Sequence, residues 1–398
     1  VVVGMSAPLA VTQPDAVKAL RVGVVIPAHN EAETLGKTLE ALLSQDWPSL
    51  RIVVVNDGST DATEALLSRF PGVRQILNRP NQGLARSINT GLQALEAEGL
   101  DLGIVLHADC VPQGTGWVGS LAVPFADPRV GAVVSARRLA GRPRGAERFF
   151  DAVAPQDFPN PEGKDREISF FRDKCDAYRL SVLKELGGFD TRAFYAAGED
   201  TDLSIRMRGR GLKILQSGRA EVAIGFSSHQ RSLSRVFRKA LQYGGAQAVL
   251  YRRHGYDGLK ARAFAAAFPA ALALMLAWTA PWFAGALLLA PAFWLLSTPA
   301  RFPALGELPL ALAAVPAGAL LQPAMGLAPA WSLAFLCVPA GLALRLAFKA
   351  ARRLGRHGEG LSGMLAGGFV AFVWWHLTGL GYLMAGTHRK EVPCLPKR

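Results

Sequence analysis

Cysteine is scarce in this chain of 398 residues. Its 4 cysteines are Cys110, Cys175, Cys337 and Cys394, and they show neither paired nor C-x-x-C spacing. Disulfide-stapled scaffolds are small, secreted and dense in cysteine, so the chain is not one of them. Its cysteine usage is that expected of a reducing compartment.

Charge is nearly missing from a long C-terminal stretch. Between residues 263 and 348 the charged residues are Arg301, Glu307 and Arg345. Proline and small polar clusters divide this stretch into four apolar pieces near 263–280, 281–298, 308–326 and 328–348, and a fifth covers about 361–387. Each is close to the roughly 20 residues of a spanning helix. We predict four or five transmembrane segments in 261–387 and a basic tail at 388–398; buried core helices are the weaker alternative.

A basic region is also missing before the first apolar residues. The N-terminal tail, residues 1–20, therefore does not resemble a secretory signal, and we expect the catalytic part to stay in the cytoplasm. The basic stretch 349–356 agrees if an even number of spans precedes it. The basic residues after 387 conflict with a single final span, so the number and topology of the spans stay open.

The net charge of +13 is concentrated before the first apolar piece. From Leu203 to Arg262 there are thirteen Lys and Arg residues but two acids, Glu221 and Asp257. Next to a membrane such a belt would meet anionic headgroups at about 1 kcal/mol per residue. Nucleic-acid binding is the competing interpretation and the poorer one. Apolar residues recur at helical spacing from 233 to 244, which predicts a basic amphipathic interfacial helix within 231–260; a helix packed on the soluble domain would show the same pattern.

Residues 21–230 alternate strands and helices. Apolar β-branched runs at 22–27, 51–55 and 104–106 predict strands, and the segments 32–44, 62–70 and 81–91 predict helices, the first with Leu35, Leu39, Leu42 and Leu43 on its buried side. This alternation is typical of a parallel sheet. Ligands bind such sheets at the carboxyl ends of the strands, where the residues 27–31, 57 and 107–109 would converge.

His107 and Asp109 lie two residues apart at the end of one predicted strand. Alternate strand residues point the same way, so this is metal-ligand spacing. The alternative is a strand that ends in polar residues because it reaches solvent.

Five motifs then carry a family resemblance. VVIPAHNEAETLGKTLEALLSQ, VVVNDGSTDAT, NQGLARSINTGL, HAD, and LGGFD with AGEDTDLSIRMRGRG resemble the inverting, GT-A-fold glycosyltransferases of family two, in consistent order over residues 21–230. Residues 376–386 are similar to the closing hydrophobic segment of membrane-bound members. The resemblance implies an α/β catalytic domain of the GT-A type, Rossmann-like with a mostly parallel sheet, followed by an α-helical transmembrane region.

The resemblance also implies a donor site for a nucleotide-sugar. Three residues would line the nucleoside pocket, namely Pro27, Ala28 and Glu31. Asp57 would accept a hydrogen bond from the base, and Arg86 and Asn89 would lie near the diphosphate or ribose. A turn and a solvated helix face are the plain alternatives for these positions.

A divalent cation, Mg²⁺ or Mn²⁺, is the implied cofactor. Asp109 matches the last Asp of the family's DxD motif and would bind the cation that bridges the diphosphate. His107 departs from the motif's first Asp, and we expect it on the nucleoside side, with direct ligation the minority view. His229 is a tentative metal or diphosphate contact, although a surface histidine would look the same.

The implied general base is Asp200. It would take the proton of the acceptor hydroxyl, with Glu199 in support. Four residues would form the turn and wall under the sugar, namely Gly187, Gly188, Phe189 and Asp190. The segment from 139 to 173 reads as loops, which we place on the acceptor side only as a guess.

The expected reaction is transfer of one or a few sugars to a membrane-embedded or lipid-linked acceptor. Processive members carry a Trp-containing motif after the base, and the stretch 229–237 has no Trp. A sugar nucleotidyltransferase is the second hypothesis, but its Gly-rich signature is absent after the first strand. A transporter or scaffold with a degenerate nucleotide-binding domain is the third.

Overall fold

The structure is a computed structural model that describes residues 19–171, 174–194, 197–226, 231–256, 258, 347–355 and 360–387. The chain divides into two compact units, which we describe separately. The first joins Val1–Gly141 to Gln156–Ser227, and the second joins Arg142–Pro155 to Ser228–Arg398. His229 and nearly all of the first four predicted spans lie outside the described residues.

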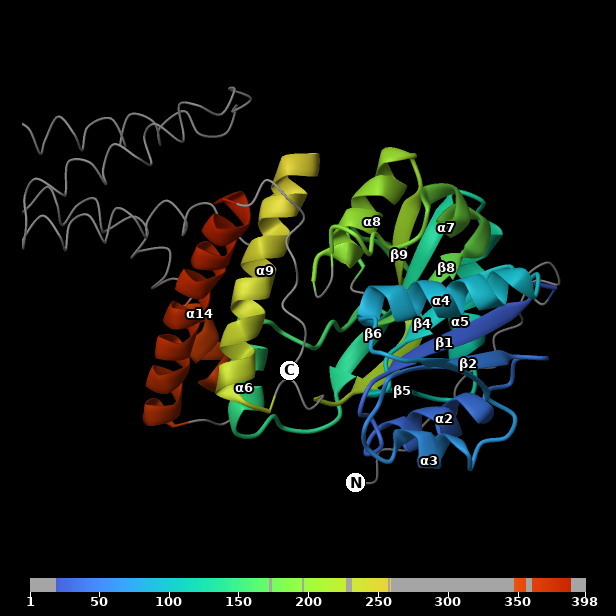
Figure 1. Ribbon diagram of the computed structural model, residues 1–398, viewed down its shortest axis with the longest axis horizontal. Helices are drawn as coiled ribbons and strands as arrows, with labels where there is room; N and C mark the ends of the chain where they lie inside the picture. The colour runs from blue at the N-terminus through green and yellow to red at the C-terminus, as the bar shows by residue number, and fades with distance from the viewer. Residues whose placement is uncertain are drawn as a thin grey trace, which may run out of the picture. The chain divides into compact units, whose positions relative to one another are not determined.

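Within its described part, the first unit is built around one nine-stranded sheet of order β3-β2-β1-β4-β8-β6-β9-β5, with β7 paired to β9 (Figure 1). The strands are β1 (Val22–Ala28), β2 (Arg51–Asp57), β3 (Arg74–Asn78), β4 (Leu102–Leu106), β5 (Cys110–Pro112), β6 (Val130–Leu139), β7 (Arg166–Glu167), β8 (Cys175–Arg179) and β9 (Lys213–Ile224). β5, β7 and β8 run against the other six. The predicted α/β fold with a mostly parallel sheet is confirmed.

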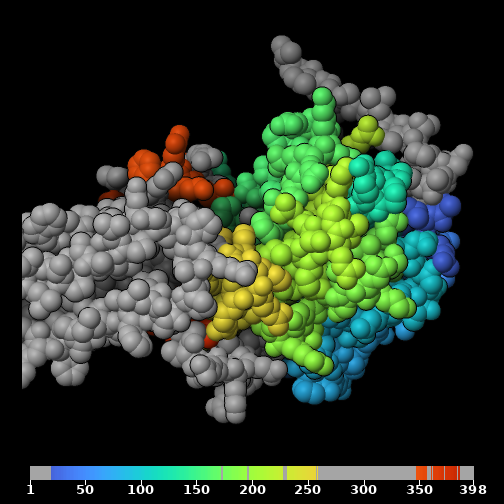
Figure 2. Space-filling view, turned by 90° about the horizontal axis from the view of Figure 1, so that it is seen from above, coloured from blue at the N-terminus to red at the C-terminus, as the bar shows by residue number. Residues whose placement is uncertain are grey.

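Helices cover both faces of this sheet. One face carries α2 (Leu35–Leu43), α3 (Thr63–Leu67), α5 (Trp117–Ala122) and the 3₁₀ turn η1 (Val123–Ala126); the other carries α4 (Leu84–Ala97), α7 (Leu180–Leu186) and α8 (Glu199–Gly209). In the space-filling view, the green and yellow-green segments that follow β6 cover much of one face of the unit, and the blue N-terminal segments lie at its edge (Figure 2).

The central strands are buried on both faces, which is why they are continuous runs of β-branched residues. β1 is buried along its whole length, and β2 is buried after Arg51. Strands of this kind occur in parallel sheets that helices cover on both sides. The prediction for α2 was wrong in one respect, because Leu43 is 54% exposed while Leu35, Leu39 and Leu42 are buried. The helix ends there, so Leu43 lies past the stripe that faces the sheet.

The strand register brings several polar segments to one edge of the sheet. Ala28 pairs with Asn56, and Asp57 pairs with Asn78, so β1, β2 and β3 end together. β4 is in register with β1 and ends at Leu106, directly before the His107–Asp109 segment. The predicted convergence of these strand ends is confirmed.

The second unit is helical in its described residues. α6 (Ala146–Val153), α9 (Leu233–His254), α14 (Leu361–Thr387) and a helical segment at 347–355 pack together. α9 and α14 approach so closely at Gly244 that a Cβ there would clash with the Thr378 carbonyl oxygen. The apolar stripe of α9 is therefore buried against α14, while its interfacial position stays a prediction. α6 forms where the sequence suggested loops, and its buried Asp151 accepts a hydrogen bond from Arg353 at 2.7 Å.

One helix in the described part of the chain is long and apolar enough to cross a membrane. It covers Ser362–Tyr382, has a mean hydropathy of 1.3, and lies within α14. The fifth predicted apolar piece is therefore a helix, and its length and composition alone allow a span.

Candidate functional site

The loops after β1 and β2 are tied to each other. Asn30 adopts a positive φ of 59°, and its Oδ1 accepts the Thr60 backbone N–H at 2.8 Å, while its own N–H donates to Ser59 Oγ at 3.0 Å. His29 Nδ1 donates to the Asp57 carbonyl oxygen at 2.9 Å. These cross-links hold the two strand ends in one arrangement, which a rigid binding pocket requires.

Asp57 is a buried organiser of the next loop. It is 4% exposed; Oδ1 accepts from Asn78 Nδ2 at 3.0 Å and the Gln82 N–H at 2.9 Å, and Oδ2 accepts the Gly83 N–H at 2.9 Å. Asn81 Nδ2 adds a bond to the Asp57 carbonyl oxygen at 2.9 Å. The Asp57 side chain thus positions the turn that precedes α4. A contact with a nucleobase stays a prediction for this residue.

Asp109 and Lys174 form a buried ion pair just beyond the end of β4. Lys174 Nζ lies 3.3 Å from Asp109 Oδ2, and the two side chains are 16% and 4% exposed. Burial raises the pKa of Asp109, but the Lys174 ammonium, the charge of His107 and the hydrogen bonds from Lys174 and Cys110 together lower the pKa below its usual value. The Asp109 carboxyl is therefore ionised at neutral pH.

Glu31 belongs to the same neighbourhood. Its pKa is raised, first by burial and further by the negative charge of Asp109, while Thr34 Oγ1 donates to Oε2 at 2.7 Å and opposes the rise. Lys174 acts on Glu31 as well. The structure thus brings Glu31 and Asp109, two of the predicted donor residues, within electrostatic reach of one another. Pro27 and Ala28 lie buried at the end of β1, shortly before Glu31 in the sequence.

A second cation lies near the pair. Arg137 on β6 is 2% exposed, its Nε and Nη2 have no hydrogen-bond partner among the described residues, and its guanidinium lies 5.6 Å from the centre of the Phe158 ring. Burial and the charge of Arg137 lower the pKa of Lys174, but Asp109 and Cys110 raise it, and the pKa is raised overall. Cys110 and Cys175 are buried here too, and burial raises the pKa of both thiols, so neither is a thiolate.

Arg86 and Asn89 lie on α4 with different surroundings. Arg86 is exposed on the first turn of the helix. Asn89 Nδ2 donates to the Phe189 carbonyl oxygen at 2.8 Å, and its Oδ1 accepts the Phe189 N–H at 3.0 Å. Asn89 therefore clamps the predicted sugar wall to α4, and a diphosphate contact from its amide stays a prediction.

The segment Gly187–Asp190 is a turn, as the sequence predicted. Gly187 ends α7 with φ of 77°, and a Cβ on Gly188 would lie 2.8 Å from Asn89 Oδ1, so both positions favour glycine. Phe189 is 1% exposed and packs edge-on against Tyr178, with ring centres 5.9 Å apart. Asp190 Oδ1 accepts the Arg192 N–H at 2.8 Å and closes the turn.

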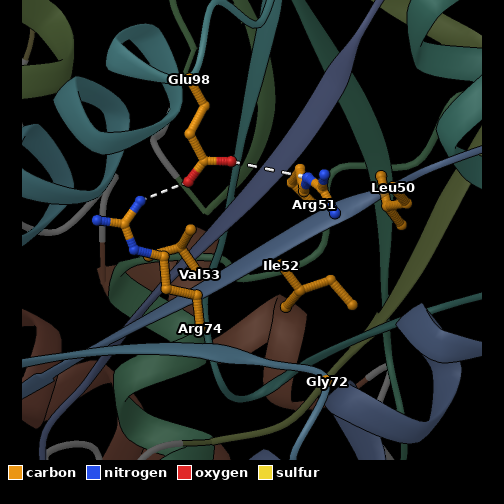
Figure 3. A pocket seen from close by; sticks show the side chains of 7 residues that line it. All are labelled: Leu50, Arg51, Ile52, Val53, Gly72, Arg74 and Glu98. Carbon is orange, nitrogen blue, oxygen red and sulfur yellow. Dashed lines mark hydrogen bonds and ion pairs between the residues drawn. The ribbon is translucent and has the colours of Figure 1, made fainter.

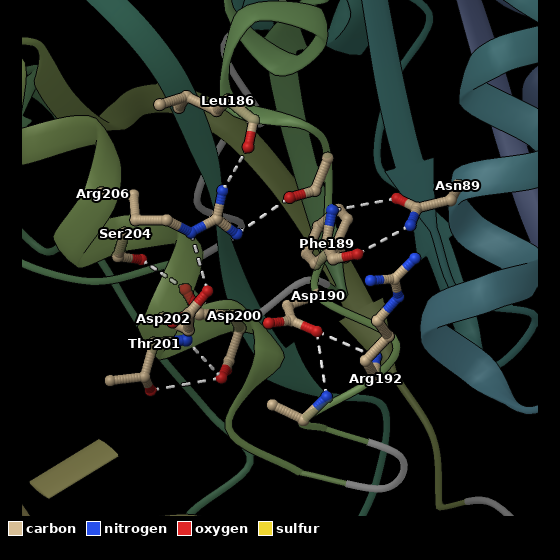
Figure 4. A network of polar contacts seen from close by, with 12 residues as sticks. Asn89, Leu186, Phe189, Asp190, Arg192, Asp200, Thr201, Asp202, Ser204 and Arg206 are labelled. Atoms are coloured by element: carbon tan, nitrogen blue, oxygen red, sulfur yellow. Dashed lines mark hydrogen bonds and ion pairs between the residues drawn. The ribbon is translucent and has the colours of Figure 1, made fainter. Parts of the chain in front are cut away.

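Arg206 joins this turn to α8 (Figure 4). Its Nε donates to Asp202 Oδ2 at 2.8 Å, and its two terminal nitrogens donate to the carbonyl oxygens of Leu186 at 2.7 Å and Gly188 at 2.8 Å. A planar guanidinium with several fixed donors suits such a bridge. The start of α8 is therefore held against the Gly187–Asp190 turn.

Asp200 lies in the first turn of α8. The helix starts after Gly198, whose φ is 91°, and carries Glu199, Asp200 and Asp202 in that turn. Asp200 is half-buried, and its Oδ1 accepts the Thr201 N–H at 2.6 Å, while Glu199 is 4% exposed. Exposed backbone N–H groups at a helix start favour an ionised carboxylate.

A separate pocket lies at the other edge of the sheet. It has a volume of about 240 Å³ and is lined by Leu50, Arg51, Ile52, Val53, Gly72, Arg74 and Glu98 (Figure 3). Arg51 and Arg74 both pair with Glu98 there. Because it lies at the amino ends of β2 and β3, this pocket is remote from the strand ends that carry Asp57.

Residues 23–187 match the family model of Glycosyl transferase family 2. The chain contains a family 2 glycosyltransferase domain. The predicted glycosyltransferase domain is therefore confirmed over residues 23–187, and its bounds of 21–230 stay a prediction.

Curated relatives agree with this family. The chain is 28% identical over 207 residues to the probable glycosyltransferase YdaM of Bacillus subtilis, covering 49% of this chain and 48% of YdaM. It is 33% identical over 97 residues to the glycosyltransferase AglE of Haloferax volcanii, covering 23% and 31% of the two chains. The chain thus matches less than half the length of these relatives.

Among solved structures, the mannosyltransferase PcManGT of Pyrobaculum calidifontis, in complex with GDP-Man and Mn²⁺, is 21% identical with a TM-score of 0.48. The likeness covers 91% of this chain and 87% of that one.

The sequence did not predict the contacts made by Lys174, Arg137 and Asn30. Lys174 comes to Asp109 from a position 65 residues further along the chain, through antiparallel pairing of β8 with β4. A single lysine before a strand has no local pattern that would reveal such a contact.

Proposed function

We propose that this protein transfers a sugar, with inversion at the anomeric carbon, from a nucleotide-sugar to a membrane-embedded or lipid-linked acceptor. The observation that carries the proposal is the family 2 match over residues 23–187, which includes Asp109. Asp200 follows the matched region, and its assigned role rests on the resemblance of the AGEDTDLSIRMRGRG motif. The donor would lie at the carboxyl ends of β1, β2 and β4, where Glu31 and Asp109 meet. Exposed Arg86 would face the diphosphate.

A divalent cation, Mg²⁺ or Mn²⁺, would offset the negative charge of the leaving diphosphate. The described residues contain no group of three His, Cys, Asp or Glu side chains that could hold a metal. Mg²⁺ is usually held by one or two carboxylates together with substrate phosphates. Asp109 suits that task, since it is an ionised oxygen ligand at the strand end.

Asp200 would act as the general base. The acceptor hydroxyl attacks the anomeric carbon, its proton passes to the Asp200 carboxylate, and the nucleoside diphosphate leaves from the opposite side of the sugar. The half-buried position of Asp200 supports this role, because an incoming hydroxyl must reach it. The clamps by Arg206 and Asn89 would keep the sugar wall and the base in one geometry.

The acceptor side is proposed to be membrane-bound. The apolar residues 263–348 and the helix within α14 support transmembrane segments, with the catalytic unit in the cytoplasm. The basic belt before them would favour anionic headgroups over nucleic acid. The lack of a Trp in residues 229–237 supports transfer of one or a few sugars rather than processive synthesis.

The test is a donor-hydrolysis and transfer screen on the full chain purified in detergent. UDP-, GDP- and dTDP-sugars are offered with Mg²⁺, with Mn²⁺ or with EDTA, and membrane lipid extract is the acceptor source. We expect one donor to be hydrolysed and transferred, loss of activity in EDTA, and loss in Asp109→Asn. Full turnover in EDTA would contradict the metal requirement.

The screen also separates the other two hypotheses. Formation of a nucleotide-sugar from a sugar phosphate and a nucleoside triphosphate would favour a nucleotidyltransferase. Binding of nucleotide without hydrolysis of any donor would favour a scaffold or transporter.

A further inference from the structure

Lys174 is held against the His107–Asp109 segment through both its backbone and its side chain. Its carbonyl oxygen accepts the His107 N–H at 2.9 Å, and its Nζ lies 3.3 Å from Asp109 Oδ2. The side chain of Lys174 is 16% exposed, so most of its length is packed inside the protein. This contact therefore belongs to the architecture of the strand end.

The buried Asp109 carboxylate requires a counter-charge. Its side chain is 4% exposed, and a buried carboxylate with no counter-charge is strongly destabilising. Lys174 supplies a counter-charge, and a divalent cation would supply another. A divalent cation and the Lys174 ammonium held by the same carboxylate oxygen would repel each other more strongly than two unit charges at the same separation, so the two compete for Asp109.

We propose that Lys174 is a donor-site residue that neutralises Asp109 in the empty site and, when a divalent cation takes Asp109, places its ammonium on the donor's diphosphate. The inference rests on the proposed function. The inference does not depend on which sugar the donor carries, because it concerns only the cation and the diphosphate.

Once a cation takes Asp109, the Lys174 ammonium needs another anionic partner. Arg137, a second buried cation nearby, cannot serve as one. A lysine ammonium sits on a flexible four-carbon stem with three donors, and phosphate oxygens are good acceptors for it. The diphosphate arrives together with the cation, so it offers the ammonium a new partner as Asp109 is taken.

The proposal predicts opposite effects of one substitution on two ligands. In Lys174→Gln the competing charge is gone, so MnCl₂ alone should bind about tenfold tighter than in the wild type. In saturating MnCl₂, UDP or GDP should bind about tenfold more weakly, because the cation then occupies Asp109 and the diphosphate lacks the Lys174 ammonium. Both affinities are measured by titration calorimetry on the full chain in detergent.

Lys184→Gln is the matched control. Lys184 also pairs with a carboxylate, Glu96, but on the exposed surface, so neither affinity should change. Weaker binding of both ligands in Lys174→Gln would indicate a merely structural role and overturn the proposal, and unchanged Mn²⁺ affinity would overturn it too. If the wild type binds neither nucleotide with or without Mn²⁺, the proposed function fails, while the Mn²⁺ measurement still decides the competition.

A second pair of variants avoids leaving a buried unpaired anion, in case Lys174→Gln does not fold. Asp109→Asn releases the ammonium, so UDP or GDP in EDTA should bind several-fold tighter than in the wild type. Adding Lys174→Gln to Asp109→Asn should abolish that gain. Equal nucleotide affinity in the single and double variants would overturn the proposal.

Discussion

The strand ends of the sheet and the start of α8 both present carboxylates, but these carboxylates differ in burial and in hydrogen-bond partners. Asp57 and Asp109 are 4% and 6% exposed, and groups from other elements bind both of them. Asp200 is half-buried, and its Oδ1 accepts hydrogen bonds from the backbone N–H and the hydroxyl of Thr201. A buried carboxylate must be paired, so it can organise a site, whereas a half-buried one remains accessible for proton transfer.

The largest expected effect is at the accessible carboxylate. Asp200→Asn keeps the size of the side chain and removes its capacity to accept a proton. Transfer should fall by about 10²–10⁴, while donor affinity stays within a few-fold. Transfer rate and donor binding by calorimetry, measured on the same preparation, separate the two effects.

Glu199→Gln is the neighbouring control. Glu199 is 4% exposed, so we expect it to support the helix start and to cost less activity than Asp200→Asn. If Glu199→Gln were inactive while Asp200→Asn stayed near normal, Asp200 would not be the general base. Full transfer in both variants would rule out the mechanism proposed for α8.

The next effect is on stability at the buried carboxylate. Asp57→Ala removes the acceptor for the Gln82 and Gly83 N–H groups and for Asn78, which would leave buried donors unpaired. The free energy of unfolding should fall by about 2–4 kcal/mol. Urea or thermal unfolding of the full chain in detergent measures it.

Asp57→Asn, which keeps one acceptor oxygen, is the graded control and should lose less stability than Asp57→Ala. If both variants unfold like the wild type but lose donor binding, then Asp57 acts on the nucleotide and the proposed division between the two regions is wrong.

The smallest effect is expected at an exposed carboxylate beside the same loops. The slight burial of Asp61 would raise its pKa, but the Thr63 hydroxyl and N–H and the Ala32 N–H hydrogen-bond the carboxylate and lower the pKa below its usual value of about 3.9. A lowered folded-state pKa stabilises the protein above the unfolded pKa, and this contribution is lost as the pH falls through the folded value.

Asp61→Asn should therefore lower stability at pH 7 by less than about 1 kcal/mol, and its difference from the wild type should shrink as the pH falls from 5 to 3. Urea unfolding across that range measures the difference. A gap that widens in acid would reverse the assigned sign of the pKa shift.

Much of the fold was readable because local patterns matched the tertiary context. The apolar runs that became β1, β2 and β4 alternate along the chain with segments of helical periodicity. The glycines of Gly187–Asp190 lie at positions that require a positive φ. α6 was read as loops because its segment is short and rich in Gly and Pro around GRPRG, and its amphipathic face is only evident against α9 and α14.

The sequence by itself determined the α/β alternation, the glycosyltransferase motifs and the position of Asp109 at a strand end, because these depend on residues close together in the chain. The tertiary structure alone decided that Asp57 ties down the loop at 81–83, that Asn89 clamps Phe189, and that Lys174 pairs with Asp109. Such contacts join residues that lie tens of positions apart, and strand order and register bring them together. A sequence pattern records local periodicity and no such register.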